Sequence, residues 1–268
     1  MADSTVRYKT LVDLSRILLL FEEAAGERGV MDIAGSLDML PSKVSRMLKT
    51  MELEGLVERH PKTGKYRAGA RFLHLGLHYL FTHPVRRTIL PHVEQIPSEL
   101  GVGASWGIFT QRRVIIVDRV SVDLDHTPHL IGSDMPLHSS SYGKLFLAYL
   151  PKERQEQILQ TIDYESFTPR TLTTIASLKY ELAVTFERGY AIDREESRTN
   201  LGAISCPIFD ESKNICAAIT IVYHLSQNID QEKALSYLSN KAAFISQQLG
   251  FKPLPLYFAI SNMLQQPS

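Results

Sequence analysis

The side chains best suited to chemistry gather first between residues 41 and 71, where the chain is strongly basic. This window carries eight Lys or Arg residues against three Glu residues, a net charge of +5. Such a cluster is typical of a site for a polyanion, and on charge alone a solvated basic face explains it equally well. The candidate residues for binding DNA are Ser42, Lys43, Ser45, Arg46, Lys49, Lys62, Lys65 and Arg67.

A second group of candidates lies in Met135–Leu150, where small polar residues precede an apolar stretch. The start of a helix has unpaired N–H groups and partial positive charge, so it attracts anions. Serine hydroxyls in this segment, that of Ser139 among them, would add hydrogen-bond donors for a ligand. Simple helix capping without any ligand explains the same residues. The segment therefore predicts either an anion-binding helix start or an ordinary N-cap.

A third group lies in Gly189–Asp210, where Asp193, Glu195 and Glu196 precede a strand. Carboxylates can act as acid and base, and Cys206 could act as a nucleophile with a histidine partner. Neither arrangement comes with a nucleophile elbow, a phosphate-binding loop or a set of metal ligands. We therefore expect no enzymatic activity and no cofactor.

Two histidine pairs hint at metal binding. His74 and His78 are four residues apart, a spacing that places both on one face of a helix, and His126 and His129 form a pair in a loop. Neither pair has an evident third ligand in the sequence. We therefore expect no bound metal.

The elements that must position the basic side chains are three helices and a hairpin. Apolar periodicity predicts helices over Leu11–Ala25, Met31–Leu37 and Pro41 to about Glu54, and a hairpin with its turn at Pro61–Gly64. Two helices joined by a tight turn and followed by such a wing describe a winged helix-turn-helix, whose second helix enters the major groove. The residues near base edges would be Ser42, Lys43, Ser45 and Arg46, and those near phosphates Lys49, Lys62, Lys65 and Arg67.

From Leu11 to Gly76 the sequence resembles the winged-helix domain of the IclR family of bacterial transcriptional regulators. The family's Ser-Thr-x-x-Arg motif appears as Ser42-Lys43-Val44-Ser45-Arg46, and its Gly-x-Tyr wing as Gly64-Lys65-Tyr66. Asp38 stands in the turn where Gly is frequent, and Asp tolerates the left-handed backbone. Lys43 replaces the usual Thr, which should change the base preference. The resemblance implies a regulator that binds double-stranded DNA.

Beyond this region helices alternate with strands, which predicts an α+β domain. An apolar helix over Ala70–Phe81 is the expected connector to it. The further expected helices are Val85–Leu100, Ser140–Leu150, Leu178–Arg188 and Asp230–Leu249. The expected strands are Gly103–Phe109, Val114–Val120, Ala203–Phe209 and Ile215–Tyr223.

This second part resembles the GAF-like effector-binding domain of the same family. The resemblance implies that Ser141 and Tyr142 offer backbone N–H groups to a ligand carboxylate, and that Asp193 accepts a hydrogen bond from a ligand or water hydroxyl. Its pocket would be lined by Met135, Ser141, Tyr142, Asp193, Leu201 and Ala203. Ser141, Tyr142 and Ala203 differ from the types frequent in the family, so the identity of the ligand does not carry over.

We expect a winged helix-turn-helix domain over residues 1–72, a connector helix over 73–86, a GAF-like ligand-binding and oligomerisation domain over 87–250 and a tail over 251–268. The expected function is that of a homodimeric or tetrameric transcription regulator of a catabolic operon. It would read a pseudo-palindromic operator and sense a small organic acid. The alternative is a second domain that only oligomerises, without an effector.

The formal net charge of the 268 residues is zero, which by itself argues against a nucleic-acid-binding protein. This net charge is the sum of a charge of +2 over residues 1–80 and a charge of −2 over the remaining residues. The overall balance therefore does not exclude DNA binding by the first part of the chain. The two cysteines are too few for a disulfide scaffold. Because nothing resembles a secretory signal and no apolar run approaches the length of a membrane span, we expect a cytoplasmic protein.

Overall fold

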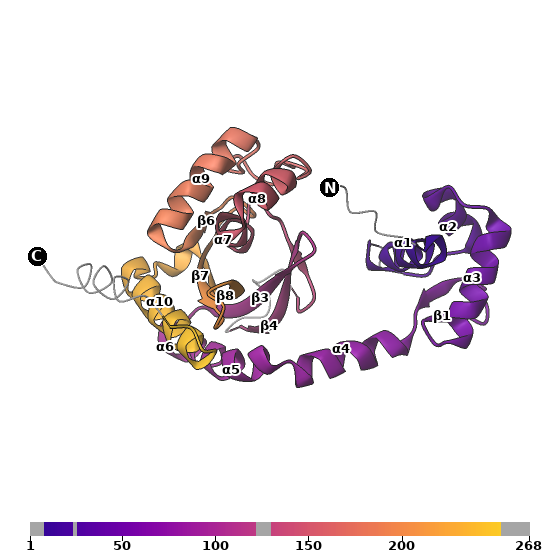
Figure 1. The fold of residues 1–268 in the computed structure, drawn as a ribbon, viewed down its shortest axis with the longest axis horizontal. Coiled ribbons are helices and arrows are strands. Elements are labelled where there is room, and N and C mark those ends of the chain that lie inside the picture. Colours follow the sequence, from indigo (N-terminus) through magenta and orange to yellow (C-terminus); the bar gives the residue numbers. More distant parts are fainter. Residues whose placement is uncertain (1–7, 24–25, 122–129, 253–268) are drawn as a thin grey trace, which may run out of the picture. The chain divides into compact units, whose positions relative to one another are not determined.

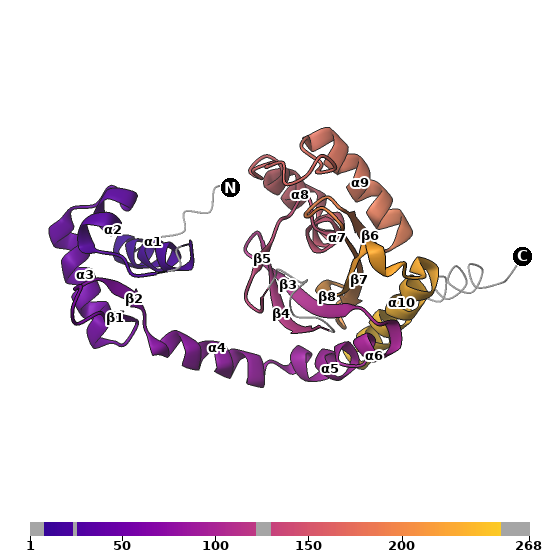
Figure 2. The same ribbon diagram turned by 180° about the vertical axis from the view of Figure 1, so that it is seen from behind.

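The computed structural model describes residues 8–23, 26–121 and 130–252. The chain divides into two compact units, with the division between His83 and Pro84 (Figures 1 and 2). His126 and His129, expected as a loop pair, lie outside the described residues, as do residues 253–268 of the expected tail.

Three helices and a two-stranded hairpin form the first unit, as the sequence predicts. They are α1 (Lys9–Glu23), α2 (Val30–Leu37), α3 (Pro41–Leu53), β1 (Val57–Arg59) and β2 (Tyr66–Ala68). α3 begins at Pro41, where the missing N–H costs no helical hydrogen bond. The helix buries Val44, Leu48 and Met51 on one face, against a core that includes Ile17 and Ile33. The opposite face of α3 is therefore left for solvent or for DNA.

Two tight turns fix the direction of α3 and of the hairpin. Asp38, between α2 and α3, has a φ of 53° and donates its N–H to the carbonyl of Ala34, so the expected left-handed residue is there. In the hairpin turn, the Nδ1 atom of His60 accepts the N–H groups of Lys62 and Thr63 at 3.2 and 3.1 Å. These local hydrogen bonds fix the turn, while Val57 and Tyr66 of the two strands are buried in the core of the unit.

The helix that follows the hairpin is α4 (Ala70–Thr82), at the position of the expected connector. It buries none of its residues within the described part of the chain. Its exposed apolar side chains are Leu73, Leu75, Leu77, Tyr79 and Phe81.

The second unit is a six-stranded sheet with helices on both faces. The strands are β3 (Gly103–Thr110), β4 (Arg113–Val120), β5 (Asp134–Met135), β6 (Ala191–Arg194), β7 (Leu201–Phe209) and β8 (Ile215–His224). Their order is β5-β4-β3-β8-β7-β6, and every neighbouring pair is antiparallel. The helices are α5 (Pro84–Val93), α6 (Ile96–Leu100), α7 (Ser141–Tyr149), α8 (Lys152–Leu159), α9 (Ile175–Arg188) and α10 (Gln231–Gln248).

The two faces of the sheet are covered by different helices (Figures 1 and 2). On one face α7 lies against the sheet, because Ser205 of β7 donates to Ser141 of α7. On the other face α10 packs, since the neighbouring Cys206 lies 3.5 Å from Ser239 of that helix. Successive residues of a strand point to opposite faces of the sheet. Ser205 and Cys206 therefore show that α7 and α10 lie on opposite faces. The expected α+β class is confirmed.

Some expected elements differ from the structure. The single helix expected over Val85–Leu100 is wrong: the chain forms α5 and α6 instead. Pro97 lies in the first turn of α6 and has no N–H to continue the ladder from α5, so a new helix begins there. The elements α8, β5 and β6 have no counterpart among the expected ones.

Candidate functional site

The candidate residues for DNA binding lie on α3 and on the hairpin. Those that are exposed are Ser42, Arg46, Lys49, Lys62, Lys65 and Arg67, whereas Lys43 and Ser45 are half-buried. The exposed face of α3 therefore presents hydroxyl and basic groups together, as its apolar periodicity predicts.

Two of these basic side chains are already paired. Lys43 forms an ion pair with Asp13 of α1, whose carboxylate is buried, and this hydrogen bond lowers the pKa of Asp13. Arg67 donates two hydrogen bonds to Glu58 across the hairpin, at 2.9 and 3.2 Å. Among the described residues no carboxylate is paired with Arg46, Lys49, Lys62 or Lys65. These four side chains are available to an incoming phosphate or base.

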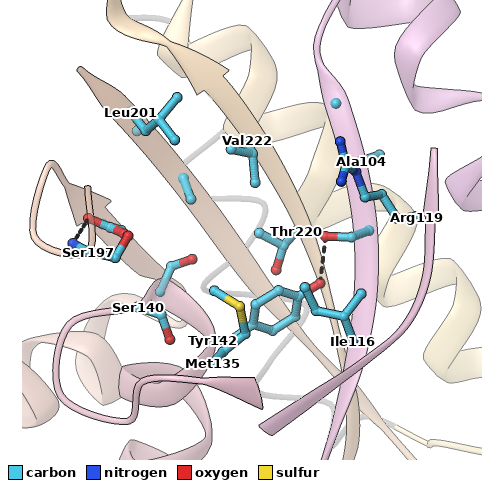
Figure 3. A pocket seen from close by; sticks show the side chains of 16 residues that line it. Ala104, Ile116, Arg119, Met135, Ser140, Tyr142, Ser197, Leu201, Thr220 and Val222 are labelled. Atoms are coloured by element: carbon cyan, nitrogen blue, oxygen red, sulfur yellow. Dashed lines mark hydrogen bonds between the residues drawn. The ribbon is translucent and has the colours of Figure 1, made fainter. Parts of the chain in front are cut away.

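A pocket in the second unit lies between the sheet and the start of α7 (Figure 3). The empty space, including the part that opens to solvent, is about 570 Å³. Ile116, Met135, Val222 and the ring of Tyr142 contribute apolar wall. A concave, mostly apolar space with a few polar groups is typical of a small-molecule site.

A row of polar side chains crosses the sheet beneath this pocket. Register places its members directly opposite one another on β4, β3, β8 and β7: they are Arg119, Ser105, Thr220 and Ser205. Ser105 lies 2.8 Å from the hydroxyl of Tyr142, and Ser205 bonds both Thr220 at 2.6 Å and Ser141 at 2.8 Å. These hydrogen bonds attach the first turn of α7 to the sheet. Burial raises the pKa of Tyr142 well above its ordinary value, so its hydroxyl is neutral.

The start of α7 is capped by Ser140. Its hydroxyl accepts the N–H of Gly143 at 3.0 Å and donates to the carbonyl of Pro136 at 2.6 Å. The capping role is therefore present. The N–H groups of Ser141 and Tyr142 fall in the first turn, where a helix offers no acceptor, and both residues line the pocket. The same helix start thus leaves two amides for a ligand.

Asp193 lines the pocket from β6 and also holds the loop that follows that strand. Its Oδ1 accepts the N–H of Glu196 at 2.7 Å and that of Ser197 at 3.3 Å, and its Oδ2 accepts the hydroxyl of Ser197. Burial raises the pKa of Asp193, against these hydrogen bonds, which lower it. The carboxylate keeps lone pairs for one further donor.

Behind this loop a fully buried lysine meets two carboxylates. The Nζ of Lys144 lies 2.5 and 2.6 Å from the oxygens of Glu196 and 3.7 Å from Glu181 of α9. Glu181 is held in turn by Arg188, at 2.8 Å. Burial raises the pKa of Glu196, and the charge of Lys144 acts in the opposite direction. The ion pair connects α7 to the loop that carries Asp193.

The pocket brings together most of the residues that the resemblance implies. Met135, Ser141, Tyr142, Asp193, Leu201 and Ala203 all line it. Ser139 is not among the residues that line it and is fully buried next to the N-cap, so the expectation that its hydroxyl adds a donor stays a prediction. Sequence reasoning missed Ser105, Arg119, Ser197 and Thr220. Single hydroxyl residues inside apolar strands were the only signal for Ser105 and Thr220.

The structure describes most of the groups that were considered for catalysis or metal binding. Burial raises the pKa of the Cys206 thiol to about 12, so this thiol is protonated at neutral pH. Glu195 is engaged with Arg170 at 3.2 Å, and both His74 and His78 are exposed on α4. In the described ranges no three His, Cys, Asp or Glu side chains are grouped as metal ligands would be.

Comparison with protein families accounts for both units. The model of the bacterial transcriptional regulator IclR C-terminal domain matches residues 77–249, and that of the IclR helix-turn-helix domain matches residues 14–61. The chain belongs to the IclR family. It is therefore a transcriptional regulator with an N-terminal DNA-binding domain, and the resemblance stated from its sequence is confirmed.

Several IclR-family proteins are similar over most of their length. The glycerol operon regulatory protein of Streptomyces coelicolor is 35% identical over 201 residues, 74% of this chain and 78% of that protein. The HTH-type transcriptional regulator XynR of Escherichia coli is 27% identical over 239 residues, 88% of this chain and 95% of that protein. The crystal structure of an IclR homologue from Microbacterium hydrocarbonoxydans, complexed with 4-hydroxybenzoate, has a TM-score of 0.75 at 24% identity and covers 90% of this chain and 99% of its own.

By their names, the Escherichia coli and Streptomyces relatives are regulatory proteins. Within the described parts of this IclR-family chain, no helix combines the length and the apolar character needed to cross a membrane.

Proposed function

We propose that this IclR-family regulator binds a pseudo-palindromic operator as a homodimer or tetramer, in the cytoplasm, through α3 and the hairpin. Supporting this, Ser42 and Arg46 are exposed on the N-terminal half of α3, the part of a recognition helix that meets base edges. Lys49, Lys62 and Lys65 are exposed and would contact phosphates.

Two of the candidate basic side chains are already ion-paired within the protein. Lys43 would reach DNA only by leaving Asp13, and Arg67 only by leaving Glu58. Ser45 is half-buried and would contact bases only where the groove approaches α3 closely. Direct reading of bases is therefore assigned chiefly to Arg46.

The experiment is a mobility-shift assay on DNA selected by the wild-type protein from a random pool. Arg46→Ala should weaken binding to the selected DNA by about 10- to 100-fold, with little effect on random DNA, because a base contact is lost. Lys62→Ala is the matched control: it should weaken both alike and reduce the salt dependence by about one counterion. Unchanged selectivity of the Arg46 variant would refute the assignment.

We further propose that the pocket at the start of α7 binds a small organic acid and that this ligand changes the affinity for the operator. The observation that carries the proposal is that Ser141 and Tyr142, whose amides belong to the first turn of α7, both line an apolar pocket beside Asp193. A carboxylate would accept from the amides, and a ligand hydroxyl would donate to Asp193. The Microbacterium homologue, which has the same fold, holds a hydroxylated carboxylic acid.

A thermal-shift screen of small carboxylates, 4-hydroxybenzoate included, tests this binding. A ligand that stabilises the wild type should stabilise Asp193→Ala much less, whereas Glu187→Ala, an exposed change on α9, should behave as the wild type. The same ligand should shift operator binding of the wild type and of Glu187→Ala, but not of Asp193→Ala. An unaltered ligand response in the Asp193 variant would show that this carboxylate is not part of the site.

The surface proposed for oligomerisation includes α4. Five large apolar side chains of this helix are exposed in the single chain, and an exposed apolar stripe of this kind is typical of a protein interface. The alternative function, a second unit that only oligomerises, predicts no thermal shift with any metabolite. Because the Streptomyces relative is an operon regulator, we propose a catabolic or metabolic operon as the target.

A further inference from the structure

The ring of Tyr142 fills the part of the effector pocket that lies between α7 and β3. The residue is buried, and its hydroxyl lies 2.8 Å from that of Ser105 on β3. Figure 3 shows the ring between Met135 and Ile116, with its hydroxyl towards Thr220. The side chain therefore extends from the first turn of α7 to the sheet and takes up space that a smaller residue would leave to a ligand.

A glycine of β3 lies directly behind this ring. A Cβ on Gly107 would lie 3.3 Å from the Cε1 atom of Tyr142 and 2.8 Å from the carbonyl oxygen of Ile115. The ring is thus packed against the backbone of the strand, and its hydroxyl is hydrogen-bonded to Ser105 of the same strand. Because a packed interior leaves few voids, the ring has no space on this side into which it could retreat from a ligand.

The free space lies over the next row of residues along the strands. Register places Gly103 of β3, Val222 of β8 and Ala203 of β7 directly opposite one another, with Asp193 of β6 at the end of the row. All four residues line the pocket. The two smallest side chains of this row leave room above the sheet beside Asp193, while Tyr142 covers the neighbouring row.

The space that the ring leaves is small. The volume in which the centre of a water molecule fits is about 40 Å³, and the total of about 570 Å³ also includes narrow gaps between atoms and open solvent. One water molecule needs about 10–15 Å³ of such volume, so the cavity holds roughly three water molecules. A carboxylate with a hydroxyl and one or two carbons is comparable in size, whereas a phenyl group alone would fill the cavity.

We propose that the effector is a short acyclic acid of no more than about four carbons, and that the side chain of Tyr142 sets this limit. This inference rests on the proposed function, because it refines the ligand class of the same pocket. With the carboxylate at the first turn of α7 and the hydroxyl beside Asp193, the rest of the ligand meets the ring of Tyr142. Acids that carry a ring are therefore excluded. Among them is 4-hydroxybenzoate, which is present in the crystal structure of the Microbacterium relative.

The experiment compares dissociation constants for α-hydroxy acids that differ only in the group on the hydroxylated carbon. Glycolate, lactate, α-hydroxybutanoate and mandelate carry hydrogen, methyl, ethyl and phenyl at this position, and a second series without the hydroxyl runs from acetate to benzoate. The full-length wild type should bind lactate at least about tenfold more tightly than mandelate, because extra atoms forced into a packed site are destabilising.

Three variants assign the limit to the ring. Tyr142→Ala should reverse the order, so that mandelate binds at least about tenfold more tightly than lactate, because its phenyl group is buried in the space of the lost ring. Tyr142→Phe keeps the ring without the hydrogen bond to Ser105 and should keep the preference for lactate. Tyr180→Ala is the matched control at an exposed position of α9 and should behave as the wild type.

A further measurement shows whether Tyr142→Ala is folded around the expected void. p-Cresol has the atoms of the missing side chain, so it should raise the midpoint of thermal unfolding of this variant and leave that of the wild type unchanged. If Tyr142→Ala does not fold, Tyr142→Leu decides, because it leaves a smaller void. This variant should reduce the preference for lactate over mandelate to about one.

The outcomes separate this inference from the proposed function. If the wild type binds mandelate as tightly as lactate, the size limit is overturned while organic-acid sensing stays intact. A preference for lactate that survives in folded Tyr142→Ala, or undiminished in Tyr142→Leu, overturns the assignment to this side chain. Absence of binding by every acid in both series, in the wild type and in the variants, refutes the proposed function and the inference with it.

Discussion

Replacing Lys144 by methionine tests whether the buried ion pair organises the ligand-binding unit. The lysine is fully buried, with its Nζ 2.5 and 2.6 Å from the two oxygens of Glu196. Methionine fills a similar volume without charge. The change leaves the Glu196 carboxylate buried, with only the N–H of Arg194 at 3.3 Å among its described partners.

Removing one partner of a buried ion pair costs about 3–5 kcal/mol, because the remaining charge is not solvated. Domains are stable by only about 5–15 kcal/mol, so Lys144→Met should leave the second unit folded but marginal. Glu196→Gln in the same background removes the orphaned charge and should recover most of the loss. Glu181 does not depend on Lys144, because Arg188 holds it at 2.8 Å.

The loss should also depend on pH in a defined direction. Burial raises the pKa of Glu196 above its ordinary value of 4.5, and Lys144 opposes that rise. Without the lysine the folded-state pKa rises further, so between 4.5 and the folded pKa the folded protein binds a proton that the unfolded chain does not. The stability of Lys144→Met should therefore increase as the pH falls from 8 towards 5.5. Asp193, whose pKa burial also raises, contributes in the same direction.

Urea unfolding, followed by tryptophan fluorescence, measures the stability of the second unit and its dependence on pH. Trp106 is the single tryptophan of the chain and is buried in β3. The control is Lys179→Met, which breaks a partly exposed pair with Glu156 and should cost less than about 1 kcal/mol. A loss below about 1 kcal/mol for Lys144→Met, or a loss that does not change with pH, would refute the reasoning.

Two other predictions address the same unit. Gly143→Ala places a Cβ 2.4 Å from the Cα of Leu137, so the overpacking should cost at least about 1–3 kcal/mol of unfolding free energy. The loss should appear as a lower midpoint of urea unfolding, and an unchanged midpoint would contradict the close approach. Arg86→Gln breaks the two hydrogen bonds to Asp118 and should lower the free energy of unfolding by about 3 kcal/mol. It should also alter the fluorescence of Trp106, whose indole N–H donates to the same carboxylate. The control is Arg87→Gln at an exposed position, and equal stability of the two variants would contradict the prediction.

Much of the first unit could be predicted because its signals are local. The apolar face of α3 repeats along a few turns, and Pro41 marks its start. The hairpin turn carries its own sequence signal, with Gly64 at a φ of 68°. Helices and turns of this kind depend on neighbours within a few residues, so a single sequence contains enough information for them.

Predictions failed where the outcome depended on distant residues. The pairing of Lys43 with Asp13, residues 30 positions apart, was not expected, and the base contact of Lys43 stays a prediction. The helix α8 and the strand β6 were not expected. α8 has too few apolar residues to give a recognisable helical periodicity.

The sequence by itself determined the family, the basic face of the recognition helix and the residue types at the start of α7. Only the tertiary structure decided which groups share the pocket. Ser105, Arg119, Ser205 and Thr220 come from four strands, and their alignment depends on antiparallel register across the sheet. Register is set by packing and strand pairing over long sequence separations, so no local pattern reveals that an arginine of β4 faces the same space as the first turn of α7.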